Sequence, residues 1–338
     1  MGVEQVGLQL EEVVRKVDRV EHGYAKAYRS EFLVWRDSGI YHQLAREVSL
    51  KEGEVHVDFG TGLGFFPGLV KNANPNAVVI GVDRNIHMIL NGARLLERDG
   101  GAVDVFHSEA VLKLRDGVFR NVHALDLEAE SERLRAVDSA KVEAGRESVP
   151  FAESVEKCVA VDPNVKLVVD DVRTLVYTRE LLNGANIQSA SLMFTGGSGR
   201  SVVDGVVGKV GCRKIHYSAE ECREAIVKNV GDLINGSFEL LSERMEVGGR
   251  VVWTDRFSVA AVNKDGSPSD LLIASLVDRL GPQAVYWDLE KCFVGLEMDK
   301  PEGAIQWTSY AAKDSDVEKL RVLSFCFQRN DRPYASVA

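Results

Sequence analysis

The segment from residue 54 to residue 83 constrains the fold of this chain more than any other. It reads EVHVDFG, then TGLGFF, PGLVKNA and AVVIGVD, so a β-rich run is followed by a glycine-rich turn, a helical run and a second β-rich run. Short strands that alternate with helices form parallel sheets with crossover helices. The sequence therefore predicts an α/β fold, a three-layer sandwich around a mostly parallel sheet.

Later segments extend this sheet to about seven strands. A helix at about 85–98 has Asn85 as its expected N-cap, and a long helix at about 219–245 begins at the Ser218 and Glu221 capping box and ends at Gly248-Gly249. The runs with β-branched and aromatic content typical of strands are VKLVVDDV (165–172), SASLMFTGG (189–197), RVVWTDRF (250–257), AVYWDL, AIQWTSYAA and VLSFCFQ.

The remaining segments predict additions to one domain. Residues 4–20 and 24–48 have helical spacing, so we expect residues 1–50 to form an N-terminal helical cap. Residues 51–338 then form the main domain. The charged stretch at about 99–162 has few large apolar residues, and we expect it to be a helical insertion that packs on the outside.

Composition restricts the function classes. The formal net charge of -10 disfavours a long phosphate backbone as the main partner, because nucleic-acid affinity depends on Lys and Arg. No CxxC, HxH or HExxH spacing occurs among the 5 cysteines and 7 histidines, so neither a metal site nor a disulfide framework is expected. No apolar run approaches the ~18 residues of a membrane span, and the first residues lack the organisation of a signal peptide. We therefore expect a cytoplasmic protein without a membrane partner.

The glycine-rich turn is the strongest local signal of a binding site. Gly60, Gly62 and Gly64 directly follow a predicted strand and precede a helix, where glycine lets the backbone approach a ligand and the helix N-terminus offers free N–H groups. A tight turn without a ligand is the alternative. Asp58 before the glycines and Asp83 at the end of the next strand favour the binding site. An acidic side chain at the position of Asp83 can reach a ribose diol.

VHVDFGTGLG followed by VIGVD resembles the first two motifs of the class I S-adenosylmethionine-dependent methyltransferases. A dinucleotide-binding dehydrogenase would have a third glycine at position 65, where this chain has Phe65. The resemblance implies that S-adenosyl-L-methionine is the cofactor. It implies the following cofactor-binding residues: Asp58, Gly60, Thr61, Gly62 and Gly64 around the amino-acid part, Asp83 at the ribose, Arg84 directly after it, Asp170 or Asp171 near the adenine, and Thr195 in the fourth motif.

Two choices stay open within this resemblance. Glu109, the last residue of VDVFHSE (103–109), competes with Asp170 and Asp171 for the third motif, and residues 165–171 are preferred because a short connection joins them to the next strand. Catalytic residues are poorly marked, since methyl transfer depends mainly on positioning and desolvation. Weak candidates are His216, Tyr217, Asp255 and Tyr28, with Tyr24, Tyr41 and Arg256 also available. His56 and His87 are expected to be structural.

The leading hypothesis is a methyltransferase that acts on a small molecule, which the acidity and the cap place ahead of nucleic acid. The alternatives are an RNA or protein methyltransferase, an aminopropyltransferase-like enzyme, and a non-catalytic cofactor-binding protein. A homodimer is possible. Fold analogy alone establishes none of these activities.

Overall fold

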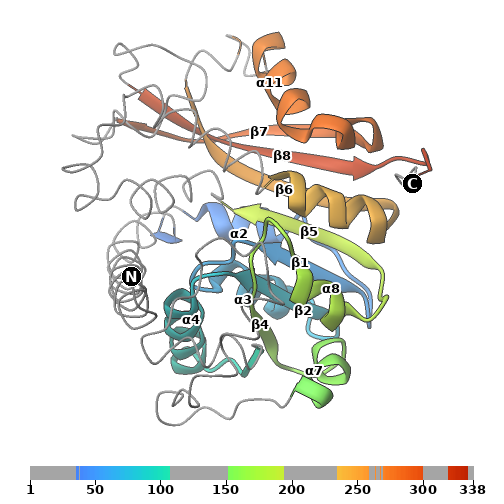
Figure 1. Cartoon of the computed structure of the whole chain (residues 1–338). Helices are drawn as coiled ribbons and strands as arrows, with labels where there is room; N and C mark the ends of the chain where they lie inside the picture. The colour runs from blue at the N-terminus through green and yellow to red at the C-terminus, as the bar shows by residue number, and fades with distance from the viewer. Residues whose placement is uncertain are drawn as a thin grey trace, which may run out of the picture.

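We analysed a computed structural model of the 338-residue chain. The structure describes residues 36–37, 39–106, 151–193, 234–258, 263, 267, 269–299 and 319–333. These residues form an α/β structure in which helices lie on both faces of one sheet (Figure 1).

Within the described residues the sheet has 8 strands, in the order β3-β4-β2-β1-β5-β6-β8-β7. The first six in this order pair in parallel, whereas β8 pairs antiparallel with both β6 and β7. The bounds are β1 Val55–Phe59, β2 Val78–Asp83, β3 Val103–Phe106, β4 Val165–Val169, β5 Ile187–Met193, β6 Met245–Ser258, β7 Trp287–Asp299 and β8 Lys319–Arg329.

The predicted three-layer sandwich is confirmed. One face of the sheet packs against α2 (Ile40–Ala45), α3 (Phe65–Ala73) and α4 (Ile86–Arg98). The opposite face packs against α8 (Val176–Leu182), a helical segment at 234–244 and α11 (Asp270–Leu280), which leads into the 3-10 helix η4 (Gly281–Tyr286). Alternate strand residues enter opposite cores, as the period of a strand requires: Val57 faces the α8 side and Val79 faces the α3 side.

The described sheet has one strand more than the expected total of about seven. It includes β3, whereas the expected run AIQWTSYAA (304–312) lies outside the described residues. Residues 103–106 lie within the segment expected to be an external insertion, but they pair with β4 at the edge of the sheet. The sequence offers residues 103–109 only as the competing strand of the third motif; the strand is short, and only Val105 and Phe106 of it are buried. Within the same segment, α7 spans Phe151–Cys158, and residues 107–150 lie outside the described part of the chain.

The strand next to β2 is β4, at 165–169, as the preferred reading of the third motif requires. Its residues Lys166 to Val169 pair with Ile80 to Asp83 in parallel register. The competing segment at 103–106 is one strand further out, so it does not adjoin β2. The carboxyl ends of β1, β2 and β4 consequently meet at one edge of the sheet.

Two helix boundaries test the capping predictions. Asn85 caps α4 as expected, because its Oδ1 accepts a hydrogen bond from the Met88 N–H at 3.3 Å. The expected long helix instead ends before Met245, where β6 begins, and Gly248-Gly249 lie inside β6. Gly248 has φ +86° there, and the pairing of β5 with β6 shifts register in this part of the strand. The glycines therefore form an irregularity of a strand and not a helix end; Ser218 lies outside the described residues.

Lys166 is an ionisable residue fully buried in β4, and its sequence context gives no warning of this. Its Nζ donates to both carboxylate oxygens of Asp162 at 2.7 Å, and Asp104 on β3 lies 3.9 Å away. Lys71 on α3 donates to the backbone oxygens of Ala77 and Asp162 nearby. These contacts join the amino ends of β2, β3 and β4. The glycine-rich turn lies at the opposite, carboxyl ends of the strands.

Candidate functional site

The turn between β1 and α3 has the backbone conformation that its glycines predict. Gly60, Gly62 and Gly64 have φ angles of +72°, +56° and +66°. Residues that carry a Cβ rarely adopt this region. The backbone N–H groups of Gly60 and Thr61 donate to the Val82 oxygen on β2 at 2.8 and 2.9 Å. The turn is therefore held against the end of β2, with the N-terminus of α3 open beside it.

Asp83, the last residue of β2, is joined directly to this turn. Its Oδ2 accepts a hydrogen bond from the Gly62 N–H at 2.9 Å, and its Oδ1 accepts one from the Asn85 N–H at 2.8 Å. Burial raises the pKa of Asp83, and the two N–H donors oppose that rise. Each carboxylate oxygen can accept a further hydrogen bond, so the side chain has capacity left for a hydroxyl donor.

Asp58 is completely buried near the end of β1, and one of its two carboxylate oxygens has no hydrogen-bond partner among the described residues. The Ser191 hydroxyl on β5 donates to Oδ1 at 2.6 Å, whereas Oδ2 has no hydrogen-bond partner among the described residues. Burial raises the pKa of Asp58 to about 7; the neighbouring Ser191 and Thr61 hydroxyls lower it, and the charge of Asp83 raises it. An unpartnered buried acceptor is costly, so this oxygen fits a site that receives a donor from a ligand.

A small hollow lies beside Asp58. Its empty volume is about 270 Å³, including space open to solvent, and its lining consists of Tyr41, Asp58, Gly60, Thr61, Leu63, Phe65, Phe66 and Met193. The Thr61 hydroxyl also lacks a partner among the described residues. Tyr41 comes from α2, and its ring meets the Phe65 ring edge-on at 5.5 Å between centroids.

The two carboxylates proposed for the third motif have different roles in the fold. Asp170 accepts hydrogen bonds from the Thr178 N–H and hydroxyl at 2.6 and 2.7 Å and from the Asp171 N–H at 2.8 Å, so it anchors the first turn of α8. Burial nevertheless raises its pKa to about 6. Burial would also raise the pKa of Asp171, but hydrogen bonds and charge from Arg173 hold it below its usual value.

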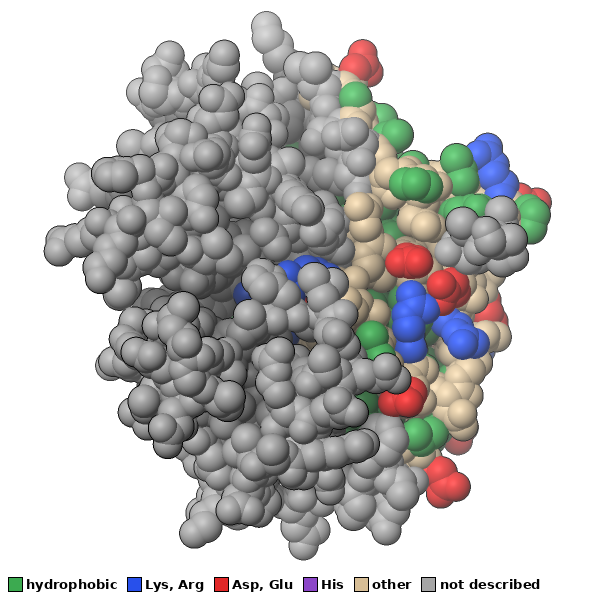
Figure 2. Space-filling view, in the orientation of Figure 1, with side chains coloured by type: hydrophobic (Ala, Val, Ile, Leu, Met, Phe, Trp, Pro, Cys, Tyr) green, Lys and Arg blue, Asp and Glu red, His purple; other side chains and the backbone are tan. Residues whose placement is uncertain are grey.

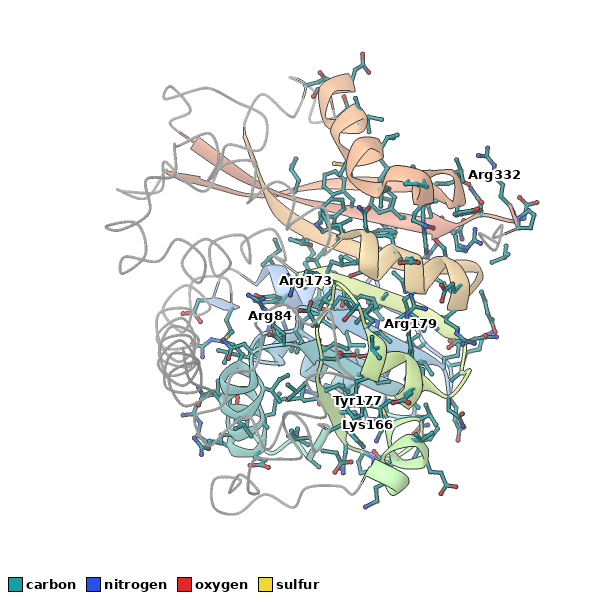
Figure 3. The ribbon with its side chains drawn as sticks, viewed as in Figure 1. Arg84, Lys166, Arg173, Tyr177, Arg179 and Arg332 are labelled. Carbon is teal, nitrogen blue, oxygen red and sulfur yellow. The ribbon has the colours of Figure 1, made fainter. Side chains whose placement is uncertain are left out.

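Two arginines accompany these carboxylates at the same edge of the sheet. Arg84 follows Asp83, and its charge lowers the pKa of both Asp83 and Asp171. Arg173 forms an ion pair with Asp171 while keeping 18% of its side chain exposed. Figure 3 labels the two arginines beside each other, and Figure 2, in the same orientation, shows Lys and Arg side chains at the surface there. The site is therefore not uniformly acidic.

Several proposed residues cannot be placed. Thr195, Glu109, His216, Tyr217, Tyr24 and Tyr28 lie outside the described residues. Asp255 lies in β6 opposite Leu323 and Arg256 opposite Val322. Among the described residues no group of three or more His, Cys, Asp or Glu could hold a metal ion.

Sequence reasoning missed part of the hollow and a network behind it. Leu63, Phe66 and Met193 line the hollow, but apolar residues at strand and helix ends carry no signal that separates them from core. His56 lies inside β1, as its strand position indicates, yet it also bonds to two serines of β5. Only the register of β1 against β5 brings these residues together.

The sheet and the turn define the class of fold. Parallel strands with a glycine-rich turn after the first, and an antiparallel strand inserted between the last two at one edge, form the fold of the class I S-adenosylmethionine-dependent methyltransferases. The resemblance found in the sequence is thus confirmed at the level of the fold. S-adenosyl-L-methionine is the cofactor of this fold class, and the spare acceptors of Asp58 and Asp83 fit its ammonium and ribose hydroxyl donors.

Comparisons with known proteins were made by sequence and by structure. No protein-family model matches the chain, and no curated protein matches it. Among solved structures, TrmN from Thermus thermophilus is 11% identical, with a match that covers 86% of this chain and 48% of that chain at a TM-score of 0.38. The chain thus spans about half the length of TrmN.

Two further solved structures cover most of both chains. A rRNA methylase from Streptococcus thermophilus is 10% identical over 86% of this chain and 95% of that chain, with a TM-score of 0.35. A 16S rRNA (adenine(1408)-N(1))-methyltransferase from Catenulisporales acidiphilia is 14% identical over 89% of this chain and 94% of that chain, also with a TM-score of 0.35.

These neighbours correct one expectation. The sequence placed a small-molecule partner ahead of nucleic acid, and that ranking is wrong, because the similar structures include enzymes named for ribosomal RNA. The physical reason is that net charge averages over the whole surface, whereas a phosphate backbone needs only a local group of cations. None of the helices within the described residues is both long and apolar enough to cross a membrane.

Proposed function

We propose that this chain transfers the methyl group of S-adenosyl-L-methionine to an acceptor that lies over the carboxyl ends of β1, β2 and β5. The single observation that carries the proposal is the pair of carboxylates at the glycine-rich turn. Asp83 is fixed by the Gly62 and Asn85 N–H groups, and Asp58 keeps an unpartnered oxygen beside the hollow. Together they present acceptors to the ammonium group and the ribose hydroxyls of the cofactor.

The residues of the chain would act by binding and by excluding water. The bound cofactor would supply an electrophilic methyl group on sulfur. Asp83 would accept hydrogen bonds from the ribose hydroxyls, and Asp58 would accept one from the ammonium group. Tyr41, Phe65 and Met193 would cover the amino-acid end and keep water from it. Methyl displacement needs alignment and desolvation more than a strong base, in keeping with the described part of the site, in which no general base stands out.

A direct binding measurement tests this proposal. We expect wild-type protein to bind S-adenosyl-L-methionine with micromolar affinity in calorimetry, and Asp83→Ala to bind it at least tenfold more weakly, about 1.4 kcal/mol. Asp288→Ala, an exposed carboxylate next to η4, is the matched control and should bind as wild type does. Binding of NAD in place of S-adenosyl-L-methionine, or of neither, would contradict the proposal.

For the acceptor we propose RNA. The supporting observation is the pair Arg84 and Arg173, which are partly exposed at the edge of the sheet where the acceptor must approach. Guanidinium groups are the usual donors to phosphate oxygens and can act from within an acidic protein when they are grouped. Their positions after the neighbouring strands β2 and β4 would fix the register of a backbone over the site.

A transfer assay separates RNA from other acceptors. Protein is incubated with radiolabelled S-adenosyl-L-methionine and a cell extract, which is then divided and treated with ribonuclease or protease. We expect acid-precipitable label that ribonuclease removes and protease does not, and less label with Arg173→Ala. Label that resists ribonuclease but is lost with protease would instead identify a protein acceptor and refute RNA.

A further inference from the structure

A chain of buried polar side chains runs behind Asp58 and connects β1 with β5. His56 Nδ1 lies 3.1 Å from the Ser189 hydroxyl, and His56 Nε2 lies 3.0 Å from the Ser191 hydroxyl. Ser191 in turn reaches Asp58 Oδ1 at 2.6 Å. The relative exposure of His56, Asp58 and Ser191 is 0%, and that of Ser189 is 4%. Four polar side chains are thus enclosed between the two strands.

Register alone explains how the chain of contacts forms. His56 stands opposite Ser189 and Asp58 stands opposite Ser191 in the parallel pairing of β1 with β5. Residues two apart on a strand share a face, so all four side chains lie on the same side of the sheet. This is the side that carries Phe66, whose ring centroid lies 6.2 Å from that of His56.

The number of protons available on each side chain determines which group donates in each hydrogen bond. A serine hydroxyl has one proton, and Ser191 uses it toward the Asp58 carboxylate. Ser191 must then accept from His56, so the proton of the neutral ring is on Nε2, and Nδ1 accepts from the Ser189 hydroxyl. Burial lowers the pKa of His56 to about 3, so the ring stays neutral at any working pH. Ser189 thus donates to His56, His56 donates to Ser191, and Ser191 donates to Asp58.

We propose that Ser189, His56 and Ser191 form a hydrogen-bonded relay that orients Asp58, so that its unpartnered oxygen receives the ammonium group of the cofactor and its proton is released on binding. This inference rests on the proposed function. His56 and the two serines are positioning residues, since none of them lines the hollow. Aligned hydrogen bonds of this kind reinforce one another in a dry interior.

The proton balance follows from the groups that face Asp58. Among the described residues these are Ser191 on β5, Thr61 in the turn, Asp83 on β2 and Tyr41 on α2, and no cation faces the carboxylate directly. Without an ammonium group, burial favours the protonated acid, and with one, the carboxylate is favoured. Asp58 therefore loses a proton to solvent when the cofactor binds. Oδ2 has almost no accessible surface, so the ammonium reaches it when the lining side chains shift, or through one bridging water.

Two ligands separate the relay from the rest of the site. S-adenosylhomocysteine carries the amino-acid end, whereas methylthioadenosine has the same nucleoside without it. Calorimetry in two buffers of different ionisation enthalpy measures affinity and protons released for each ligand. For wild type we expect about one proton released per S-adenosylhomocysteine at pH 6 and close to none at pH 8. Binding of methylthioadenosine should release none at either pH.

Ser191→Ala removes the link between His56 and Asp58. We expect it to bind S-adenosylhomocysteine roughly tenfold more weakly at pH 7 and to shift the pH midpoint of binding upward, because the carboxylate loses a donor that stabilises its charge. Its affinity for methylthioadenosine should stay as in wild type. Ser189→Ala should show a smaller change in the same direction.

Thr254→Val is the matched control, since Thr254 is a buried strand hydroxyl bonded to Ser324 at 2.8 Å, away from Asp58. It should lose stability without altering proton release. Equal weakening of both ligands by Ser191→Ala, or binding of S-adenosylhomocysteine without proton release, would overturn the relay while leaving the proposed function standing. Failure of wild type to bind either ligand would overturn both.

Discussion

Asp58 is the residue whose environment departs furthest from that of an ordinary carboxylate. It is fully buried, it receives one hydrogen bond from Ser191, and its pKa is raised to about 7. The folded chain therefore binds a proton at Asp58 that the unfolded chain has already lost at neutral pH. Between the unfolded value near 4 and the folded value, each rise in pH lowers the free energy of unfolding.

The matching variant is Asp58→Asn, which keeps the shape and removes the charge. We expect the stability of wild type relative to this variant to fall by roughly 4 kcal/mol between pH 4 and pH 8, from the shift in pKa. Chemical denaturation of both proteins across that range measures the difference. A difference independent of pH would mean that Asp58 has the same pKa in the folded chain as in the unfolded chain.

At the scale of elements, the glycine-rich turn is held in place by α4 as well as by β2. Gly92 in α4 packs so closely that a Cβ there would lie 2.4 Å from the Leu63 oxygen. Leu63 belongs to the turn and lines the hollow. The position of the turn thus depends on a residue without a side chain in the helix that follows Asp83.

Gly92→Ala tests this contact against helix propensity. In a helix with free space, alanine would stabilise the chain by about 1 kcal/mol. Here we expect destabilisation by about 2 kcal/mol and weaker S-adenosyl-L-methionine binding, because the Leu63 backbone must move. Asn91→Ala, at the neighbouring and partly exposed position, is the control and should be neutral or stabilising. A more stable Gly92→Ala protein would show that α4 and the turn are not in contact.

At the scale of the whole molecule, the binding residues come from elements that adjoin one another only in the folded sheet. Asp58, Asp83 and Tyr41 lie on β1, β2 and α2, so a ligand that contacts all three links these elements. A ligand that binds only the folded state adds about 2.7 kcal/mol to its stability at a concentration of 100 times its Kd.

We therefore expect S-adenosyl-L-methionine at that concentration to raise the unfolding temperature of the chain by several degrees in calorimetry. At the same concentration Asp83→Ala should show a smaller rise, because its sites are less fully occupied. An unchanged unfolding temperature for wild type would mean that the ligand does not prefer the folded chain.

What the sequence determined by itself is local in origin. The order of strand, glycine turn, helix and strand at 54–83 predicts the parallel sheet, the left-handed glycines and the cap of α4 at Asn85, because each depends on neighbours in the chain. The acidic residues at strand ends were found for the same reason, since a strand end is visible as a change of pattern.

Only the tertiary structure decided which of these residues meet. The pairing of β1 with β5 brings His56 and Asp58 to serines more than 130 positions away, with sequence separations of 133 and 135. β3 joined the sheet although its own pattern is weak, because β4 offered an edge to pair with. The site therefore depends on the register between strands that are far apart in the sequence. That register is set when the strands bury their apolar side chains in a common core, so no single strand's sequence determines it.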